Sequence, residues 1–498
     1  MFTRGVKLVD FYCSDHGKAI SNADLYQDIE KTVLPTLSDE SRKLYQKLLL
    51  DNPERSRHVT HDIAYIASIT DRSERLKLYE ESIRGLMVDA VAGLFKQAGV
   101  GPDNIDFIVV TSSVGKTMPS AASIIASEFG FASKTVTLNL GDMACSSGLA
   151  AVDAGVRFLR SERAPKRCLV VALEAVTNLF NQSEYGVVPN VVFGEGAAAI
   201  LLSTHREPAK YAIKESVRTI AAHKEAYEVI RFTENEKGPS IRLSRELPQV
   251  AAGAIKDNLQ QFVPRVVSPW DKLRFLVTKK IPDWQNRLEY WALHPGGTAV
   301  LNGLARNLKL ARGNLAFSFR VFDQRSNMSS PSIFYVLREI EMHGPKKRDR
   351  VLMMSFGSGF KVNTMLMKRL SSARPERSTV VELETRDGQL HCRALQQSPG
   401  SAATADDLFQ ADLATLDSKS IASDIWKRTL GVNELRICPS VSRNLSNEQY
   451  CSLVHEVRGL LMPKGSLAEE YVGGGSPHGN AGKLPMKPAD RNEFKQVS

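Results

Sequence analysis

A single cysteine stands between a predicted strand and a predicted helix, where a thiol could act as a nucleophile. The stretch "LNLGDMACSSGLAAVDAG" (138–155) places Cys145 after an apolar run and before a segment with helical spacing of its apolar residues. The first turn of a helix has unpaired backbone N–H groups, and the helix dipole favours a negative charge there. We therefore expect a thiol with a lowered pKa. The alternative is a packed structural cysteine, but the small residues around Cys145 leave room for an incoming group.

Two further segments offer side chains that could assist this thiol. In "HPGG" (294–297), His294 ends a predicted strand, and Gly296 and Gly297 would let a ligand approach the backbone closely. The alternative is a histidine that is satisfied by local hydrogen bonds. In "SNMSS" (326–330), Asn327 places a carboxamide at a second strand-to-helix corner.

A glycine turn is expected between two strands at "FGSGF" (356–360). Its backbone N–H groups could form an oxyanion site. The residues concerned are Gly357, Ser358 and Gly359. Because a turn of this kind is weakly specific by itself, the assignment depends on its position relative to the thiol.

The elements that must position these groups occur twice in the same order. The first set of strands is expected at 104–113, 135–140 and 167–175, and the second at 288–295, 314–321 and 350–359. Cys145 precedes the last strand of the first set by 22 residues, and Asn327 precedes that of the second by 23. Strands that alternate with amphipathic helices predict βαβ units and mostly parallel sheets. We therefore expect an α/β fold of two pseudo-equivalent halves, with Cys145 and Asn327 at equivalent corners facing the seam.

The pattern changes after about residue 370. A hairpin is expected around Asp387-Gly388, followed by a linker at "SPGSAATADD" (398–407) and a helix capped at Ser446. The predicted units are an N-terminal half (1–210), a C-terminal half (211–370), an extension of unknown role (371–465) and a disordered tail (466–498).

Other chemistries that these residues suggest are not supported by the surrounding sequence. Cysteine, histidine and asparagine in this order also occur in papain-type proteases, but a "CGSCW"-like signature is missing. The segment "SSVGKT" (112–117) resembles a phosphate-binding loop, yet Val110 replaces the required first glycine and Pro119 interrupts the helix that should follow. His58 and His61 have no further ligands near them in the sequence, so we expect no metal site.

The composition predicts a globular protein with a basic body. Of the net charge of +10, the first 370 residues carry +11, because 15 basic and 16 acidic residues follow residue 370. A basic body suits phosphate-bearing ligands such as nucleotide-linked thioesters, whereas no basic run with interleaved aromatic residues marks a nucleic-acid path. Six cysteines without C-x-x-C spacing do not predict zinc or disulfide sites. Without a signal peptide or an apolar run of about 18 to 20 residues, we expect a cytoplasmic protein with no transmembrane segment.

With these motifs in place, the chain resembles the thiolase-fold condensing enzymes. It is most similar to the 3-ketoacyl-CoA synthases of fatty-acid elongation, with the type III polyketide synthases close behind. The resemblance extends from about residue 7 to residue 370. It is carried by "LVDFYC" (8–13), "NLGDMACSSGLAAVDAG" (139–155), "VPNVVFGEGAAAILLS" (188–203), "RLSRELPQVAAGAIKDNL" (242–259) and "SFGSGFKVN" (355–363).

The resemblance implies a five-layered thiolase-like fold and a decarboxylative Claisen condensation. The family's nucleophile falls on Cys145, its histidine on His294 and its asparagine on Asn327. An acyl-CoA starter would acylate the thiol, and malonyl-CoA would lose CO2 and extend it to a 3-oxoacyl-CoA. The family uses coenzyme A thioesters as substrates, needs no other cofactor and usually forms homodimers.

The chain departs from the elongases in several motifs, so other activities stay open. "HPGG", "NMSS" and "FGEGAAA" are similar to the polyketide synthases, which would release a pyrone or resorcinol-type product. Plant-type elongases begin with membrane-spanning helices, whereas this sequence starts where their soluble domain would, which leaves only peripheral membrane contact open. A degradative thiolase needs a second cysteine, but none lies between Cys168 and Cys392. A non-catalytic scaffold that binds CoA or lipid is the remaining alternative.

Overall fold

The computed structural model describes most of the chain. The described residues are 5–115, 117–180, 182–235, 238–278, 284–372, 378–387, 389–397, 404–413, 416–429, 432–437 and 439–468. The predicted tail therefore lies outside the described residues from 469 onward. Across the described ranges, no helix is long and apolar enough to cross a membrane.

The first half is a five-stranded mixed sheet covered by helices on both faces. Its strands, in spatial order, are β1 (Lys7–Cys13), β7 (Glu195–Ser203), β6 (Arg167–Ala175), β4 (Phe107–Thr111) and β5 (Val136–Leu140). β4 pairs in parallel with β5 and β6, and the other pairs are antiparallel. Alternate residues of β6 and β7 join two different hydrophobic clusters, one with α4 (Arg72–Ala98) and one with α6 (Ser147–Ser161). Strands buried on both faces explain the continuous apolar runs in the sequence.

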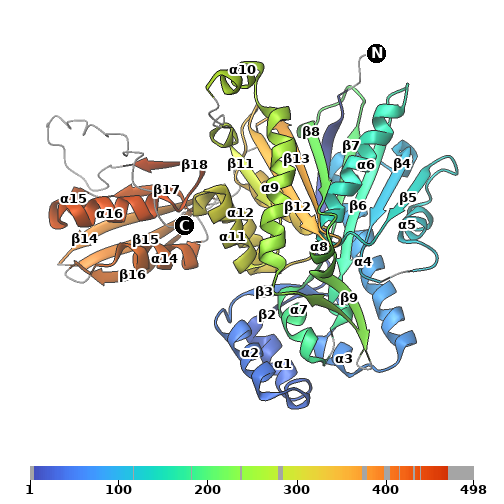
Figure 1. Ribbon diagram of the computed structural model, residues 1–498, viewed down its shortest axis with the longest axis horizontal. Coiled ribbons are helices and arrows are strands. Elements are labelled where there is room, and N and C mark those ends of the chain that lie inside the picture. Colours follow the sequence, from blue (N-terminus) through green and yellow to red (C-terminus); the bar gives the residue numbers. More distant parts are fainter. Residues whose placement is uncertain are drawn as a thin grey trace.

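The second half repeats this order with one strand fewer. Its strands are β8 (Tyr211–Ile220), β13 (Lys361–Arg369), β12 (Arg350–Gly357) and β11 (Tyr290–Leu293). β1 and β8 pair over two residues, which joins both half-sheets into one nine-stranded sheet. α6 and α13 (Ser332–Met342) each contact strands of both halves, whereas α4 covers the first half and α9 (Leu247–Val266) covers the second. Helices and half-sheets thus alternate in five layers, and the predicted duplicated α/β fold is confirmed (Figure 1).

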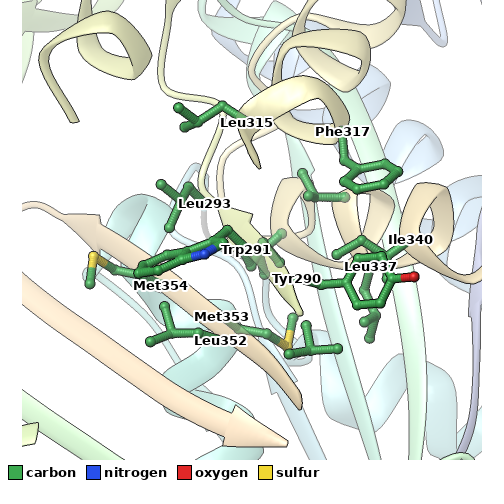
Figure 2. Packing of buried hydrophobic residues seen from close by; sticks show 14 of the residues in the cluster. Tyr290, Trp291, Leu293, Leu315, Phe317, Leu337, Ile340, Leu352, Met353 and Met354 are labelled. Carbon is green, nitrogen blue, oxygen red and sulfur yellow. The ribbon is translucent and has the colours of Figure 1, made fainter. Parts of the chain in front are cut away.

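The strand predicted at 314–321 is wrong, because this segment is helical. A 3₁₀ turn (Arg312–Leu315) leads into α12 (Ala316–Arg325). A continuous apolar run does not distinguish a buried strand from a buried helix, and α12 is buried on most of its surface. Phe317 packs on Tyr290 of β11, with ring centroids 6.0 Å apart (Figure 2). α12 thereby covers the edge strand β11, and no strand among the described residues of the second half corresponds to β5.

Smaller elements complete the body. A cap on the carboxyl side of the sheet contains β2 (Lys18–Ser21), α1 (Asn22–Glu30), α2 (Asp39–Leu50), β3 (Ser56–Val59), α3 (Ile63–Ser68) and α7 (Val187–Val192). Outside this cap lie α5 (Ala121–Phe129), α8 (Lys224–Glu228), the hairpin of β9 (Ile230–Asn235) and β10 (Gly238–Leu243), α10 (Pro269–Thr278) and α11 (Thr298–Leu308).

The extension folds as a separate module beside the body (Figure 1). Its sheet has the order β16 (Thr404–Asp412), β15 (Gln389–Gln397), β14 (Ser378–Arg386), β17 (Val432–Ile437) and β18 (Leu461–Ala468). Its helices are α14 (Ser418–Thr429), α15 (Pro439–Asn444) and α16 (Asn447–Arg458).

Two predictions for the extension are confirmed and one is partly wrong. β14 and β15 form the predicted hairpin, with Asp387 at a positive φ of 50°, while Gly388 lies outside the described residues. Ser446 caps α16 through a capping box. The predicted linker is wrong in its second part, because residues 404–407 belong to β16, and 398–403 lie outside the described residues.

Candidate active site

Cys145 lies at a strained turn between β5 and α6. It occupies the 3₁₀ turn Ala144–Ser146, immediately before the first residue of α6. Asp142 and Ala144 have positive φ angles of 61° and 46°, which cost energy for residues with a Cβ. The apolar stripe predicted for α6 is buried as expected, through Leu149, Val152, Val156 and Leu159. The buried contacts of these residues anchor α6, and this anchoring stabilises the strained turn that precedes the helix.

Asn327 lies at the matching corner between α12 and α13, and its backbone is tied to the first half. Its N–H donates to the carbonyl of Val192 at 2.9 Å, and its carbonyl accepts the N–H of Gly194 at 3.0 Å. The side-chain oxygen accepts the Ser329 N–H at 2.7 Å, which fixes the orientation of the amide. Both Oδ1 and Nδ2 lie 4.0 Å from the Sγ of Cys145. The predicted meeting of the two corners at the seam is therefore observed.

His294 follows β11 and lines the same cavity as the thiol and the carboxamide. Its backbone N–H donates to Met354 at 2.9 Å, and its ring meets Phe356 edge to face at 5.6 Å. The side chain is 1% exposed, and neither ring nitrogen has a hydrogen-bond partner. The cavity, with a volume of about 190 Å³, is lined by Cys145, His294 and Asn327 together. A buried imidazole whose ring nitrogens have no hydrogen-bond partner is suited to binding a ligand.

The glycine turn lies directly against the Cys145 corner. A Cβ on Gly357 would come within 2.5 Å of the Met143 carbonyl oxygen and 2.9 Å of the Cys145 backbone nitrogen. Asn363 on β13 donates from Nδ2 to the carbonyl of Ser146 at 2.6 Å. The turn that joins β12 and β13 therefore braces the corner that carries the thiol.

Of the remaining predicted site residues, Ser358 and Gly296 line the same cavity, and Gly297 and Gly359 are the next residues in the chain. Ser358 lines it and donates from Oγ to the Ile230 carbonyl at 3.1 Å. Gly296 also lines it, whereas Gly297 has a φ of 144° at the start of α11 and Gly359 has a φ of 71° in the turn. Both angles lie in the region that glycine adopts readily.

Burial keeps both the thiol and the imidazole uncharged. Burial raises the pKa of Cys145 to about 11, although hydrogen bonding with Ser329 and Asn327 lowers it in part. Burial lowers the pKa of His294 to about 3. The lowered thiol pKa expected from the helix position is therefore wrong, because desolvation outweighs the favourable end of the helix.

A buried carboxyl group beside the site was not predicted from the sequence. Glu174 is the next-to-last residue of β6 and accepts the N–H groups of Ser113 and Val114 at 2.9 and 3.0 Å. Ser113 and Val114 line the cavity. Burial raises the pKa of Glu174 to about 8, and its charge raises the pKa of Cys145. The signal in the sequence is an acidic residue inside the apolar run "RCLVVALEA".

A buried arginine holds the wall of the cavity next to Asn327. Arg57 donates to the carbonyls of Asn190 at 2.7 Å and Phe193 at 3.2 Å, and to Oδ1 of Asn22 at 2.7 Å. Phe193 lines the cavity and forms a β-bridge with Asn327. Arg57 thus fixes the end of α7 and Phe193, whose backbone pairs with that of Asn327, and its position in the sequence gave no sign of this role.

Two family models match the body of the chain. The model described as FAE1/Type III polyketide synthase-like protein matches residues 2–281, and that of the C-terminal domain of chalcone and stilbene synthases matches residues 213–371. The 3-ketoacyl-CoA synthase 16 of Arabidopsis thaliana is 34% identical over 310 residues, covering 58% of this chain and 63% of the relative. The 3-ketoacyl-CoA synthase 7 of the same plant is 29% identical over 388 residues, covering 74% and 83%. The chain thus spans less than two thirds of the length of the first of these relatives.

Solved structures share the fold at low identity. A type III pentaketide synthase from Neurospora crassa superposes with a TM-score of 0.61 and 19% identity, covering 73% of this chain and all of that one. PKS-I from the brown alga Ectocarpus siliculosus gives a TM-score of 0.61 with 17% identity, covering 74% and 100%. Both show the thiolase-like fold of the body.

Proposed function

Because the chain belongs to the FAE1/type III polyketide synthase-like family, we propose that it is a condensing acyltransferase. The reaction is a decarboxylative Claisen condensation of an acyl-CoA with malonyl-CoA, which yields a 3-oxoacyl-CoA as in fatty-acid elongation. The observation that carries this proposal is the meeting of a thiol, a carboxamide and a neutral, unpartnered imidazole at one cavity. Relatives that are named 3-ketoacyl-CoA synthases favour elongation over polyketide formation.

The first half-reaction loads the acyl group onto Cys145. The sulfur attacks the thioester carbonyl of the acyl-CoA, the bond to the CoA sulfur breaks, and the thiol proton ends on the departing CoA. Because the free thiol is uncharged near pH 7, the proton must leave as the new bond forms. The turn at Gly357 and Ser358 lies close enough to the corner to offer N–H groups to the oxyanion.

The second half-reaction forms the carbon–carbon bond. Malonyl-CoA loses CO2, and the negative charge that builds on its thioester oxygen accepts hydrogen bonds from Nδ2 of Asn327 and the ring N–H of His294. A neutral imidazole suits this task, because an imidazolium would protonate the carbanion instead of preserving it. The carbanion attacks the carbonyl of the Cys145 thioester, the carbon–sulfur bond breaks, and the 3-oxoacyl-CoA leaves. The Cys145 thiolate that is released takes up a proton from solvent. These steps require no cofactor beyond the coenzyme A thioesters.

Product analysis tests the reaction. Purified protein is incubated with acyl-CoAs of graded chain length and isotopically labelled malonyl-CoA, and the products are identified by mass. Elongation gives a thioester one two-carbon unit longer, whereas a polyketide synthase gives a pyrone or resorcinol-type product. Cys145→Ala should bind CoA thioesters without forming an acyl-enzyme. A wild-type chain that binds them but never forms an acyl-enzyme would instead be a non-catalytic scaffold.

We also propose that the chain works as a homodimer in a reducing compartment. β5 is an edge strand of the nine-stranded sheet, and its residues are mostly exposed, including Val136 at 50%. An exposed edge can pair with its copy across a twofold axis. Val136→Lys would place like charges opposite each other there, so sedimentation should show a loss of dimer. The free thiols of Cys13, Cys145 and Cys168 support a reducing environment.

A further inference from the structure

Helix α10 presents an unusual amount of apolar surface to solvent. Trp270 is 79% exposed, Leu273 52%, Leu276 63% and Val277 77%. Among the elements that the structure describes, α10 carries more large exposed apolar side chains than any other. Because a compact protein seldom leaves such a cluster uncovered, this face requires a partner.

The four side chains form one stripe, and basic residues border it. With 100° between successive residues of a helix, Leu276, Leu273, Val277 and Trp270 follow one another within an arc of about 120°. Lys272 and Arg274 fall on the two sides of this arc and are both exposed, and neither forms an ion pair in the described part of the chain. An apolar stripe between basic borders is typical of helices that lie in a membrane interface.

The opposite side of α10 is fixed to the body, so the stripe has a defined outward direction. The carboxylate of Asp271 forms an ion pair with Arg287, in which Nη2 donates to Oδ1 at 2.8 Å. It also accepts a hydrogen bond from the Ser268 hydroxyl at 2.6 Å. Figure 1 shows α10 standing at one end of the body, away from the C-terminal module. The stripe is therefore presented by a helix that is anchored through Asp271 in its first turn, at one end of the body.

A large apolar groove lies beside α10. It has a volume of about 970 Å³ and runs between α9, α10 and α11, with Phe275 and Leu276 on its wall. Ala251 and Val300 line both this groove and the cavity that holds Cys145. The groove beside α10 and the cavity that holds Cys145 are therefore separated by side chains that they share.

We propose that α10 docks the protein on the surface of an anionic lipid bilayer. Trp270 would lie at the level of the headgroups, where tryptophan is enriched, and Lys272 and Arg274 would face the anionic lipids. The body charge of +11 acts in the same direction. A second copy of the chain is a poorer occupant, because a stable dimer buries about 800 Å² per partner, and four side chains of one short helix fall short of that area.

Docking would bring the groove against the hydrocarbon layer. In that position a long acyl chain could pass from the bilayer into the groove and toward Cys145 without crossing water. This consequence rests on the proposed function, whereas docking itself depends only on α10. Cys145→Ala should therefore bind vesicles as the wild-type chain does.

Vesicle co-sedimentation of the full chain tests the proposal. Vesicles of phosphatidylcholine alone are compared with vesicles that also contain phosphatidylserine. Leu273 and Leu276 are 52% and 63% exposed, so together they offer the apolar area of about one fully exposed leucine side chain. Leu273→Ser/Leu276→Ser removes this area and should lower partitioning of the protein onto vesicles about tenfold or more. The matched control is Leu50→Ser/Leu76→Ser, which replaces two exposed leucines on other helices and should bind as the wild type does. Lys272→Gln/Arg274→Gln should lower the preference for phosphatidylserine, by about fivefold for each charge removed.

Two further measurements separate docking from other causes. Brominated lipids should quench the fluorescence of Trp270, and Trp270→Phe should abolish that quenching. The oligomeric state should be the same for the wild type and for Leu273→Ser/Leu276→Ser in size-exclusion chromatography. Equal vesicle binding by both leucine variants would overturn the proposal. So would a loss of dimer in the α10 variant without any vesicle binding by the wild type, because α10 would then be an interface between copies.

Discussion

Gly357→Ala is the most direct test of how the Cys145 corner is held. Gly357 ends β12, and its backbone is not in the left-handed region, so alanine introduces no backbone strain. The added Cβ would lie 2.5 Å from the Met143 carbonyl oxygen, 2.7 Å from the Ser146 nitrogen and 2.9 Å from the Cys145 nitrogen. All three atoms belong to the backbone, so no side chain can rotate away. The corner itself must move.

The size of the effect follows from these distances. Contacts below 3.0 Å are essentially never made by a real Cβ, so the corner must shift by about half an ångström or more. Overpacking of this kind costs about 1–3 kcal/mol of unfolding free energy. A misplacement of about 1 Å lowers a reaction rate about a hundredfold, so we expect acylation of Cys145 to slow about 10- to 100-fold.

The assay measures acyl-enzyme formation by intact-protein mass after mixing with an acyl-CoA, together with urea unfolding. Gly101→Ala is the matched control, because its Cβ would meet nothing within 4 Å and its backbone is extended, with φ of −128°. This control should acylate and unfold as the wild type does. The reasoning is refuted if Gly357→Ala acylates within about twofold of the wild type at unchanged stability, because the turn would then not brace the corner.

Three other residues give independent predictions. His294→Ala should slow malonyl-CoA decarboxylation by about 10²- to 10³-fold, whereas His294→Gln, which keeps a donor, should recover part of the rate; release of CO2 measures both. Arg57→Lys cannot reach the acceptors that the guanidinium joins, so urea unfolding should show a loss of about 1.5–3 kcal/mol. The pKa of Glu174 is raised from 4.5 to about 8, so the unfolded chain ionises before the folded one and stability falls as pH rises between those values. The unfolding free energy should fall by at most about 1.4 kcal/mol per pH unit. Glu174→Gln should remove this pH dependence, and urea unfolding at pH 5, 6.5 and 8 measures it.

The parts of the fold that the sequence predicted are those fixed by local pattern. Apolar runs located β4, β6 and β12, and helical spacing located α6, because burial on one or both faces leaves a periodic record in the chain. The same logic failed for α12. Its run of apolar residues is buried on most sides, and a helix without a polar face has the composition of a buried strand.

The candidate site was predictable in its residue types and less so in its surroundings. The facing positions of Cys145 and Asn327 were predicted from the duplicated order of elements, although helix α12 and not a strand precedes Asn327. The roles of Arg57 and Glu174 depend on contacts with residues more than 50 positions away. The charge state of the thiol also depends on this three-dimensional burial. A single sequence does not encode such contacts in its spacing.

The failure at α12 also bears on assembly, because it makes the two ends of the sheet different. In the first half, β5 is left as an edge with exposed residues. In the second half, the segment that would form the equivalent strand is helical, and Phe317 and Leu315 pack over β11 instead (Figure 2). A sheet with two open edges could add copies without limit, whereas one open edge can pair only once with its own copy. The asymmetry between the halves therefore favours a closed twofold pair over a filament. It also leaves the side of the second half that carries α9, α10 and α11 free for the docking proposed above.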